Sequence, residues 1–189
     1  MRINLLLLLT EKNVRDKALK SLTLYLVKKK DWSDLDLDKI WKALFYCTLN
    51  KNDIASGGYE LLIWKYVGMW MSDKMKIQQE LAENLALLIH KFPVVELKIR
   101  FIHSFFKTIH REWHGIDGLR LDKFYSLIRR FVHQSFVLLQ EQGWTMDLVE
   151  KFASIISSEI LSKLPNGLRI HICDLYLKEI YEAVGKSVC

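Results

Sequence analysis

The sequence predicts an all-α protein that folds as one domain over residues 1–189. Apolar residues recur at the helical spacings of three and four along every long segment, and the strict alternation typical of strands does not occur. Only two prolines, Pro93 and Pro165, and eight glycines interrupt these segments. Half of the residues are hydrophobic, which is enough to bury a real core. We therefore expect seven or eight helices joined by short loops.

The first part of the chain predicts two helices separated by a polar loop. The first begins near Asn13 and ends in three lysines, whose positive charge complements the carbonyl end of the helix. Asp36 is the expected N-cap of the second. Their predicted inward faces are Val14, Ala18, Leu22 and Tyr25, then Ile40, Trp41, Leu44 and Phe45.

In the middle of the chain, the sequence predicts a helix that begins at Asp73 and ends before Pro93, because proline cannot continue a helix. The next helix runs from Val94 to Trp113, and Gly115 ends it. The predicted inward residues are Ile77, Leu81, Leu85, Leu88 and Ile89 in the former and Leu97, Phe101, Phe105 and Ile109 in the latter.

Three more helices complete the prediction. Asp117 caps one that extends to Gly143, Thr145 caps the next, and the last follows the turn at 164–167 and ends at Gly185. Their predicted inward residues are Leu121, Phe124, Tyr125, Ile128, Val132, Phe136 and Leu139; Leu148, Phe152, Ile155, Ile156 and Ile160; and Leu168, Ile172, Leu175, Tyr176 and Ile180.

Positive charge is concentrated in two blocks of the chain. The net charge of +6 divides into +6 for residues 1–30 (8 basic, 2 acidic), −3 for 31–90 (6 and 9), +5 for 91–130 (9 and 4) and −2 for 131–189 (5 and 7). Such blocks are typical either of solvated helix faces or of surfaces that contact phosphate or acidic proteins.

The stretch 105–131 places basic residues around a predicted helical corner. Its apolar positions fill the inner faces of two helices, and arginine is rarely buried without a partner, so we expect most of the basic side chains to point outward. Those tied to Glu112, Asp117 or Asp122 would be structural. Together with the lysines that end the first helix, they are the candidate contacts for RNA or a partner: Arg111, Arg120, Lys123, Arg129, Arg130, Lys28, Lys29 and Lys30.

The sequence predicts neither an enzyme nor a metal site. His103, His110 and His114 could share a helix face, but the string HREWH places its glutamate away from the position required by the zinc protease motif H-E-x-x-H. Phosphate-binding glycine loops, dinucleotide fingerprints and nucleophile elbows are lacking. We expect no catalytic residue, metal or cofactor, and no small-molecule substrate.

Other features indicate a reducing compartment and no membrane span. Cys47, Cys173 and Cys189 are odd in number and far apart, which does not suit a disulfide framework. The apolar run at residues 3–9 is short and lacks a cleavage site before Glu11. We expect a soluble intracellular chain.

Four segments resemble the nucleolar ribosomal RNA processing protein 1 family. They read IWKALFYC (40–47), MWMSDKMKIQQELAENLALLIHKF (69–92), REWHGIDGLRLDKFYSLIRR (111–130) and LPNGLRIHICDLYLKEI (164–180). The resemblance follows most of the chain in order. It implies an α-α superhelix of the HEAT or armadillo kind, where the residues alone leave a simple bundle equally open.

The resemblance also implies a function and marks one departure. It implies a non-catalytic scaffold of pre-ribosomal particles in the nucleus and nucleolus, required for rRNA processing and large ribosomal subunit biogenesis. Its implied partners are pre-ribosomal proteins, with precursor rRNA as a further candidate. Residues 48–68 separate two elements that the family pattern joins almost directly. We interpret them as an insertion, either genuine or a gene-model artefact.

A second function class stays open at this point. A general helical-repeat adaptor that binds only protein, with no RNA role, fits the same helices and charges. Pulldown with and without nuclease distinguishes the two classes.

Overall fold

The computed structural model describes residues 12–46, 68–161 and 166–185, and this part of the chain is helical without a strand. This confirms the all-α class. Its α-helices are α2 (Lys12–Lys28), α3 (Asp34–Tyr46), α5 (Met75–Leu87), α6 (Val95–Glu112), α7 (Gly118–Glu141), α8 (Met146–Ile156) and α9 (Asn166–Gly185). Shorter helical segments are η2 (Leu88–Lys91), η3 (Trp113–Gly115) and the π-helical η4 (Ser157–Leu161), which continues α8.

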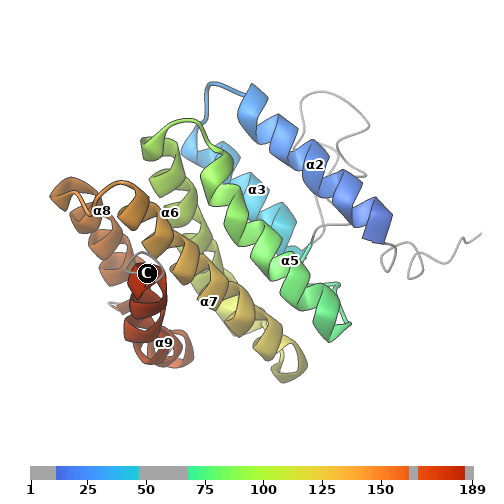
Figure 1. The fold of residues 1–189 in the computed structure, drawn as a ribbon. Helices are drawn as coiled ribbons and strands as arrows, with labels where there is room; N and C mark the ends of the chain where they lie inside the picture. Colours follow the sequence, from blue (N-terminus) through green and yellow to red (C-terminus); the bar gives the residue numbers. More distant parts are fainter. Residues whose placement is uncertain (1–11, 47–67, 162–165, 186–189) are drawn as a thin grey trace, which may run out of the picture.

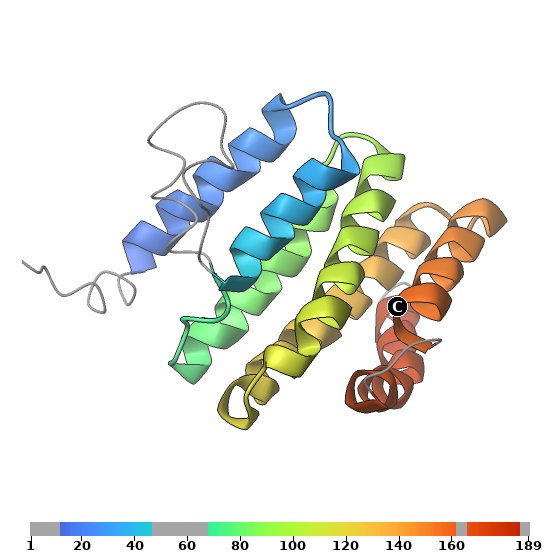
Figure 2. The ribbon, with the colours of Figure 1, turned by 180° about the vertical axis from the view of Figure 1, so that it is seen from behind.

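The helices alternate between two layers as the chain proceeds. One layer holds α2, α5, α7 and α9, and the other holds α3, α6 and α8 (Figures 1 and 2). Successive helices run up one layer and down the other, with α2 at one end of the stack and α8 and α9 at the opposite end. This alternation is consistent with the α-α superhelix that the family resemblance implied.

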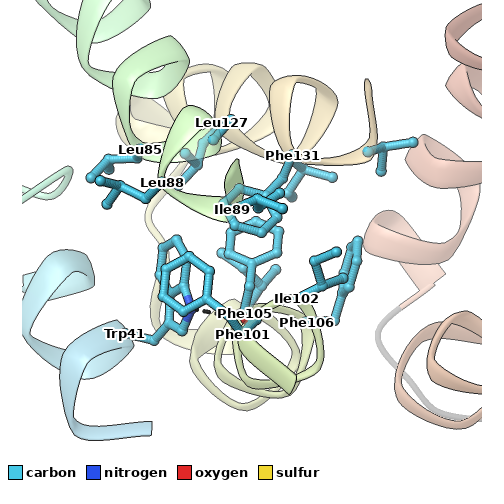
Figure 3. Packing of buried hydrophobic residues seen from close by; sticks show 14 of the residues in the cluster. Trp41, Leu85, Leu88, Ile89, Phe101, Ile102, Phe105, Phe106, Leu127 and Phe131 are labelled. Carbon is cyan, nitrogen blue, oxygen red and sulfur yellow. Dashed lines mark hydrogen bonds between the residues drawn. The ribbon is translucent and has the colours of Figure 1, made fainter. Parts of the chain in front are cut away.

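Aromatic side chains fill the space between the layers. The ring of Trp41 in α3 lies 4.9 Å from that of Phe101 and 4.8 Å from that of Phe105, both in α6. It also lies 5.0 Å from Phe131 of α7, and its indole nitrogen donates a hydrogen bond of 3.1 Å to the carbonyl of Phe101 (Figure 3). One tryptophan therefore joins three helices and still satisfies its only polar atom.

The predicted helix caps are right in part. Asp117 is the N-cap of α7, and its carboxylate accepts from the amide of Arg120. Thr145 occupies the N-cap position of α8, although its hydroxyl makes no capping bond. Asp73 is one residue too early, because Lys74 is the N-cap of α5.

The prediction for α3 is wrong by one turn. Ser33 precedes the helix, its hydroxyl accepts from the amide of Asp36 at 3.1 Å, and the carboxylate of Asp36 accepts from the amide of Ser33 at 3.2 Å. This is a reciprocal capping box with Asp36 inside the first turn. Sequence inspection placed the cap at the acid and overlooked the serine three residues before it.

The helix ends follow from local chemistry. Phe92 is extended, as required of a residue before proline, and this ends η2. Gly143 (φ 65°) and Trp144 (φ 54°) are both left-handed after α7, and their amides return to the carbonyls of Gln140 and Leu139. Glycine adopts this conformation without the steric cost that a β-carbon brings.

The end of α3 is bonded directly to the segment that follows residues 48–68. The amide of Met69 donates to the carbonyl of Leu44 at 2.8 Å, and the amide of Trp70 donates to the carbonyl of Phe45 at 3.0 Å. These carbonyls would bond to residues 48 and 49 in a continuing helix. Met69 and Trp70 thus bond to α3 as the next two residues of that helix would. The sequence also suggests a short helix around 59–67, which lies outside the described residues.

Candidate functional site

The corner between α6 and α7 is the centre of the predicted contact surface. α6 ends at Glu112, η3 turns the chain, and the capped start of α7 fixes the exit direction. Trp113 is buried beneath the turn and its ring packs against Tyr125 at 5.4 Å. The cap and the buried tryptophan therefore fix the positions from which the side chains of the corner extend.

Arg111 is exposed at the end of α6, as predicted. Its Nε lies 2.7 Å from the carboxylate of the adjacent Glu112, which also accepts a hydrogen bond from the hydroxyl of Tyr46 in α3. Burial tends to raise the pKa of Glu112, but the bonds from Tyr46 and Arg111 outweigh it and the pKa is lowered. Burial, followed by the bond to Glu112, raises the pKa of Tyr46 to about 12. The carboxylate ties α3 to α6 and is ionised at neutral pH.

Arg120 is held by the fold on two sides. Its guanidinium pairs with Asp117 and lies over the ring of Trp70, 4.8 Å from the centroid. Arginine over an aromatic face gains a cation–π attraction in addition to the ion pair. The side chain remains partly exposed, so it is both a structural residue and part of the surface.

Lys123 is an exception to the expectation that most basic side chains of the corner point outward. It is only 4% exposed, and its ammonium donates to the carbonyls of Trp70 at 2.6 Å and Ser72 at 2.8 Å. These carbonyls belong to the turn between α3 and α5, so helical amides do not bond to them. A buried ammonium group with several donors suits this position. Lys123 is a structural residue, and we remove it from the candidate contacts.

Arg129 and Arg130 connect α7 to its two neighbours in the layer. Arg129 lies 2.6 Å from Glu179 of α9, and its guanidinium also lies 3.8 Å from Glu182. Arg130 lies 3.2 Å from Glu83 of α5. Both side chains are about half exposed, so part of each guanidinium faces solvent while the rest holds the layer together.

Lys28, Lys29 and Lys30 lie at the opposite end of the molecule from the corner. Arg100 of α6 donates to the carbonyl of Trp32, in the loop that follows the lysines. Arg100 lies three turns, or roughly 16 Å, before Arg111 along the same helix. The two basic blocks of the sequence, residues 1–30 and 91–130, thus contribute to two separate surfaces.

The three lysines have different surroundings. Lys29 pairs with Asp36 at 2.8 Å and lies 4.6 Å over the ring of Trp32. Lys28 and Lys30 are exposed, and within the described part of the chain neither has an ion-pair partner. These two ammonium groups are available to a ligand.

Two histidines of the predicted helix face converge on one carboxylate. His103 Nε2 lies 3.3 Å and His110 Nδ1 3.9 Å from the carboxylate of Glu159 in η4, whereas His114 is exposed. This arrangement joins α6 to the end of α8 and needs no ion.

Sequence inspection missed a charged cluster between α7 and α9. Glu179 is only 2% exposed, and its two oxygens face Arg129 and His133, the latter at 3.1 Å. Ligand atoms of His133, Glu179 and Glu182 lie within 4.8 Å of one another. The guanidinium of Arg129 contacts both carboxylates, so a cation already compensates their charge. The missed signal was an acid on the otherwise apolar inner face of α9.

Among the described helices, none combines the length and the apolar character needed to cross a membrane.

Comparison with known proteins gives one consistent result. The sequence profile described as nucleolar protein, Nop52, matches residues 5–53 and 61–188 and omits only 54–60 inside the chain. The chain is 37% identical over 187 residues to human ribosomal RNA processing protein 1 homolog B, and this alignment covers 95% of the chain and 22% of the relative. Identity to human ribosomal RNA processing protein 1 homolog A is 34% over 178 residues (90% and 34%). Identity to the Caenorhabditis elegans homolog is 31% over 160 residues (83% and 35%). The chain thus spans between about a fifth and a third of the length of these relatives.

Proposed function

Because this chain belongs to the Nop52 family of nucleolar proteins, we propose that it is a non-catalytic ribosome-assembly factor. It acts in the nucleolus as a helical scaffold of pre-ribosomal particles and is required for maturation of precursor rRNA and the large subunit. The observation that carries the proposal is that similarity to proteins named for rRNA processing spans 95% of the chain. The similarity therefore includes both layers of the fold.

The charged side chains support a scaffold role. Arg120, Arg129 and Arg130 each join a neighbouring element through an ion pair or ring contact, and each keeps part of its guanidinium at the surface. A fold fixed in this way presents its surfaces in a defined geometry with little further ordering on binding.

Two surfaces are the proposed contacts. The first holds Lys28 and Lys30, with Lys29 beside them, at the end of α2. The second is the corner with Arg111 and Arg120. Guanidinium and ammonium groups bind phosphate and carboxylate, so RNA and acidic assembly factors are the ligand classes that fit. Arg129 and Arg130 are secondary contacts because acidic residues occupy one side of each.

Affinity purification of the tagged chain from nucleolar extract tests the proposal. We expect pre-ribosomal proteins and precursor rRNA to be recovered, and nuclease treatment to reduce recovery if RNA is contacted directly. If phosphate is bound, each neutralised phosphate changes the log–log salt slope by about −0.7 to −0.9.

A matched pair of variants sharpens the experiment. Lys28→Glu/Lys30→Glu removes the two unpaired ammonium groups, and Lys74→Glu/Lys76→Glu makes the same change in net charge on exposed residues at the start of α5. The first pair should lower recovery tenfold or more and the second should leave it unchanged. Equal recovery of both variants and the unmodified chain would remove this surface from the proposal.

A further inference from the structure

The outer face of α9 carries an apolar stripe that the described helices leave uncovered. Ile170, Cys173, Leu177, Tyr181 and Val184 recur at spacings of three and four, and all five are exposed, with Leu177 at 76% and Tyr181 at 77%. The opposite face of α9 is also apolar and packs on α7. The helix thus has two binding faces, of which the fold uses one.

A groove lies beside this stripe, between α8 and α9. It has a volume of about 340 Å³ and an apolar lining that includes Ala153, Ile156, Leu161, Cys173 and Leu177. Several exposed side chains of α8 and η4 are small (Ala153, Ser154, Ser157 and Ser158), and Leu161 at the end of η4 adds a large exposed apolar one to the lining. Small residues allow the backbone of a packing helix to approach closely.

The order of the two layers shows which element fits the groove. Each helix of the α3–α6–α8 layer lies across from members of the other layer, and α8 and α9 end the stack (Figures 1 and 2). If the alternation between the two layers continued, the next helix would lie beside α8 and across from α9. A further helix in that place would cover the apolar stripe just as α7 covers the inner face of α9.

The charges at the groove specify that helix further. Glu150 of α8 and Asp174 of α9 are exposed on the faces that carry Ala153 and Leu177, and neither has an ion-pair partner in the part of the chain that the structure describes. Glu182, farther along α9, is not one of these unpaired acids, because Lys178 and Arg129 contact its carboxylate. A second copy of the same surface would bring these carboxylates together, whereas a basic ligand would neutralise them.

We propose that the α8–α9 groove and the outer α9 stripe bind an amphipathic helix of a protein partner, whose apolar residues repeat at i, i+3 or i+4 and i+7 and are flanked by Lys or Arg. Such helix-in-groove recognition uses the apolar anchors for affinity and the flanking charges for specificity. The inference stands on the geometry of α8 and α9 and does not depend on the proposed role in ribosome assembly.

Two designed peptides test this directly. Both are labelled 18-residue helices with the same leucine stripe; one has lysines on its flanks and the other has glutamates. In fluorescence anisotropy titrations of the full chain, we expect the lysine peptide to bind at least tenfold more tightly. Equal binding of the two peptides, or no binding of either, would overturn the proposal.

Variants assign the binding to this face. Leu177→Glu should weaken the lysine peptide tenfold or more, while Leu119→Glu, at a residue 97% exposed on α7, should leave it unchanged. Glu150→Lys/Asp174→Lys should reverse the preference between the peptides. Circular dichroism confirms folding in each case. If the Leu177→Glu and Leu119→Glu variants bind the lysine peptide equally well, the peptide does not bind at the α8–α9 groove. A dimer in sedimentation equilibrium that Leu177→Glu dissociates would identify a second copy as the occupant and overturn the proposal.

Discussion

The amide of Met69 donates a hydrogen bond of 2.8 Å to the carbonyl of Leu44, the bond that the amide of residue 48 would make if α3 continued. The same relationship joins Trp70 to Phe45. The segment after residue 68 therefore meets the end of α3 in helical register. This is the basis for the prediction that residues 48–68 are an insertion.

The first prediction is that deletion of residues 48–68 leaves the fold intact. Cys47 would then be followed by Met69, whose bond to Leu44 becomes an ordinary i to i−4 helical bond. Shortening the connection between α3 and α5 also lowers the entropic cost of folding, so the free energy of unfolding should stay equal or rise by up to about 2 kcal/mol. Thermal unfolding measures it.

A shorter deletion is the control for that experiment. Residues 54–60 are the only internal ones outside the family profile, and their removal should be neutral as well. Loss of cooperative unfolding in the 48–68 deletion alone would mean that the flanking residues of this segment contribute to the core.

The second prediction concerns Trp41. Trp41→Ala removes a ring that contacts three aromatic residues, together with its hydrogen bond to the carbonyl of Phe101, so we expect a loss of about 3–5 kcal/mol. Leu119→Ala, at a residue 97% exposed, should change stability by no more than about 0.5 kcal/mol. Urea denaturation compares the two, and a similar small effect of both would contradict the packing described.

The third prediction separates structural from surface lysines. Lys123→Met removes the donor to the carbonyls of Trp70 and Ser72 and should cost about 1–3 kcal/mol. Lys28→Met, at an exposed residue, should have almost no effect on stability. Chemical denaturation of both variants tests the contrast, and equal stability would return Lys123 to the set of surface contacts.

The fourth prediction concerns Arg129 and Arg130. Arg129→Glu leaves the buried carboxylate of Glu179 beside a second acid, and we expect a loss of roughly 2–3 kcal/mol, reduced from the fully buried case because Arg129 is partly exposed. Arg130→Glu faces Glu83, which is itself exposed enough for solvent to screen the pair, and should cost about 0–1 kcal/mol. Thermal unfolding distinguishes them; an equal effect would mean that burial of Glu179 does not matter.

The fifth prediction is a pH dependence that Tyr46 and Glu112 share. The lowered pKa of Glu112 contributes stability above its ordinary value of 4.5, and this is lost as the pH falls through the folded-state pKa. The raised pKa of Tyr46 contributes stability below its ordinary value of 10.0, and this is lost as the pH rises toward about 12.

Tyr46→Phe tests that dependence at both ends. It should remove a phenol whose pKa is about 12 from an ultraviolet absorbance titration. It should also reduce the loss of stability in acid because Glu112 loses one donor. An unchanged titration curve would contradict the pairing of these two residues.

Much of the fold could be read from spacing alone. The inward positions of α3, α6 and α7 follow from apolar residues three and four apart, and Asp117 was identified as a cap because its short side chain reaches the free amides of a helix start. Ser33 was missed because two acids nearby offered equally good caps.

The side chains of the candidate site were harder to predict. In the sequence, Lys123 and Arg129 have the pattern of surface residues, because the groups that bind them come from distant segments, the turn at 70–72 and α9. Long-range partners of this kind depend on how the helices stack, which local periodicity does not specify.

Complementation tests the proposed role in rRNA maturation most directly. Cells depleted of their own copy of this protein should accumulate precursor rRNA, measured by hybridisation to the precursor. The unmodified chain and Lys74→Glu/Lys76→Glu should restore processing, whereas Lys28→Glu/Lys30→Glu should restore it poorly at equal protein level. Unchanged precursor rRNA after depletion would contradict the account.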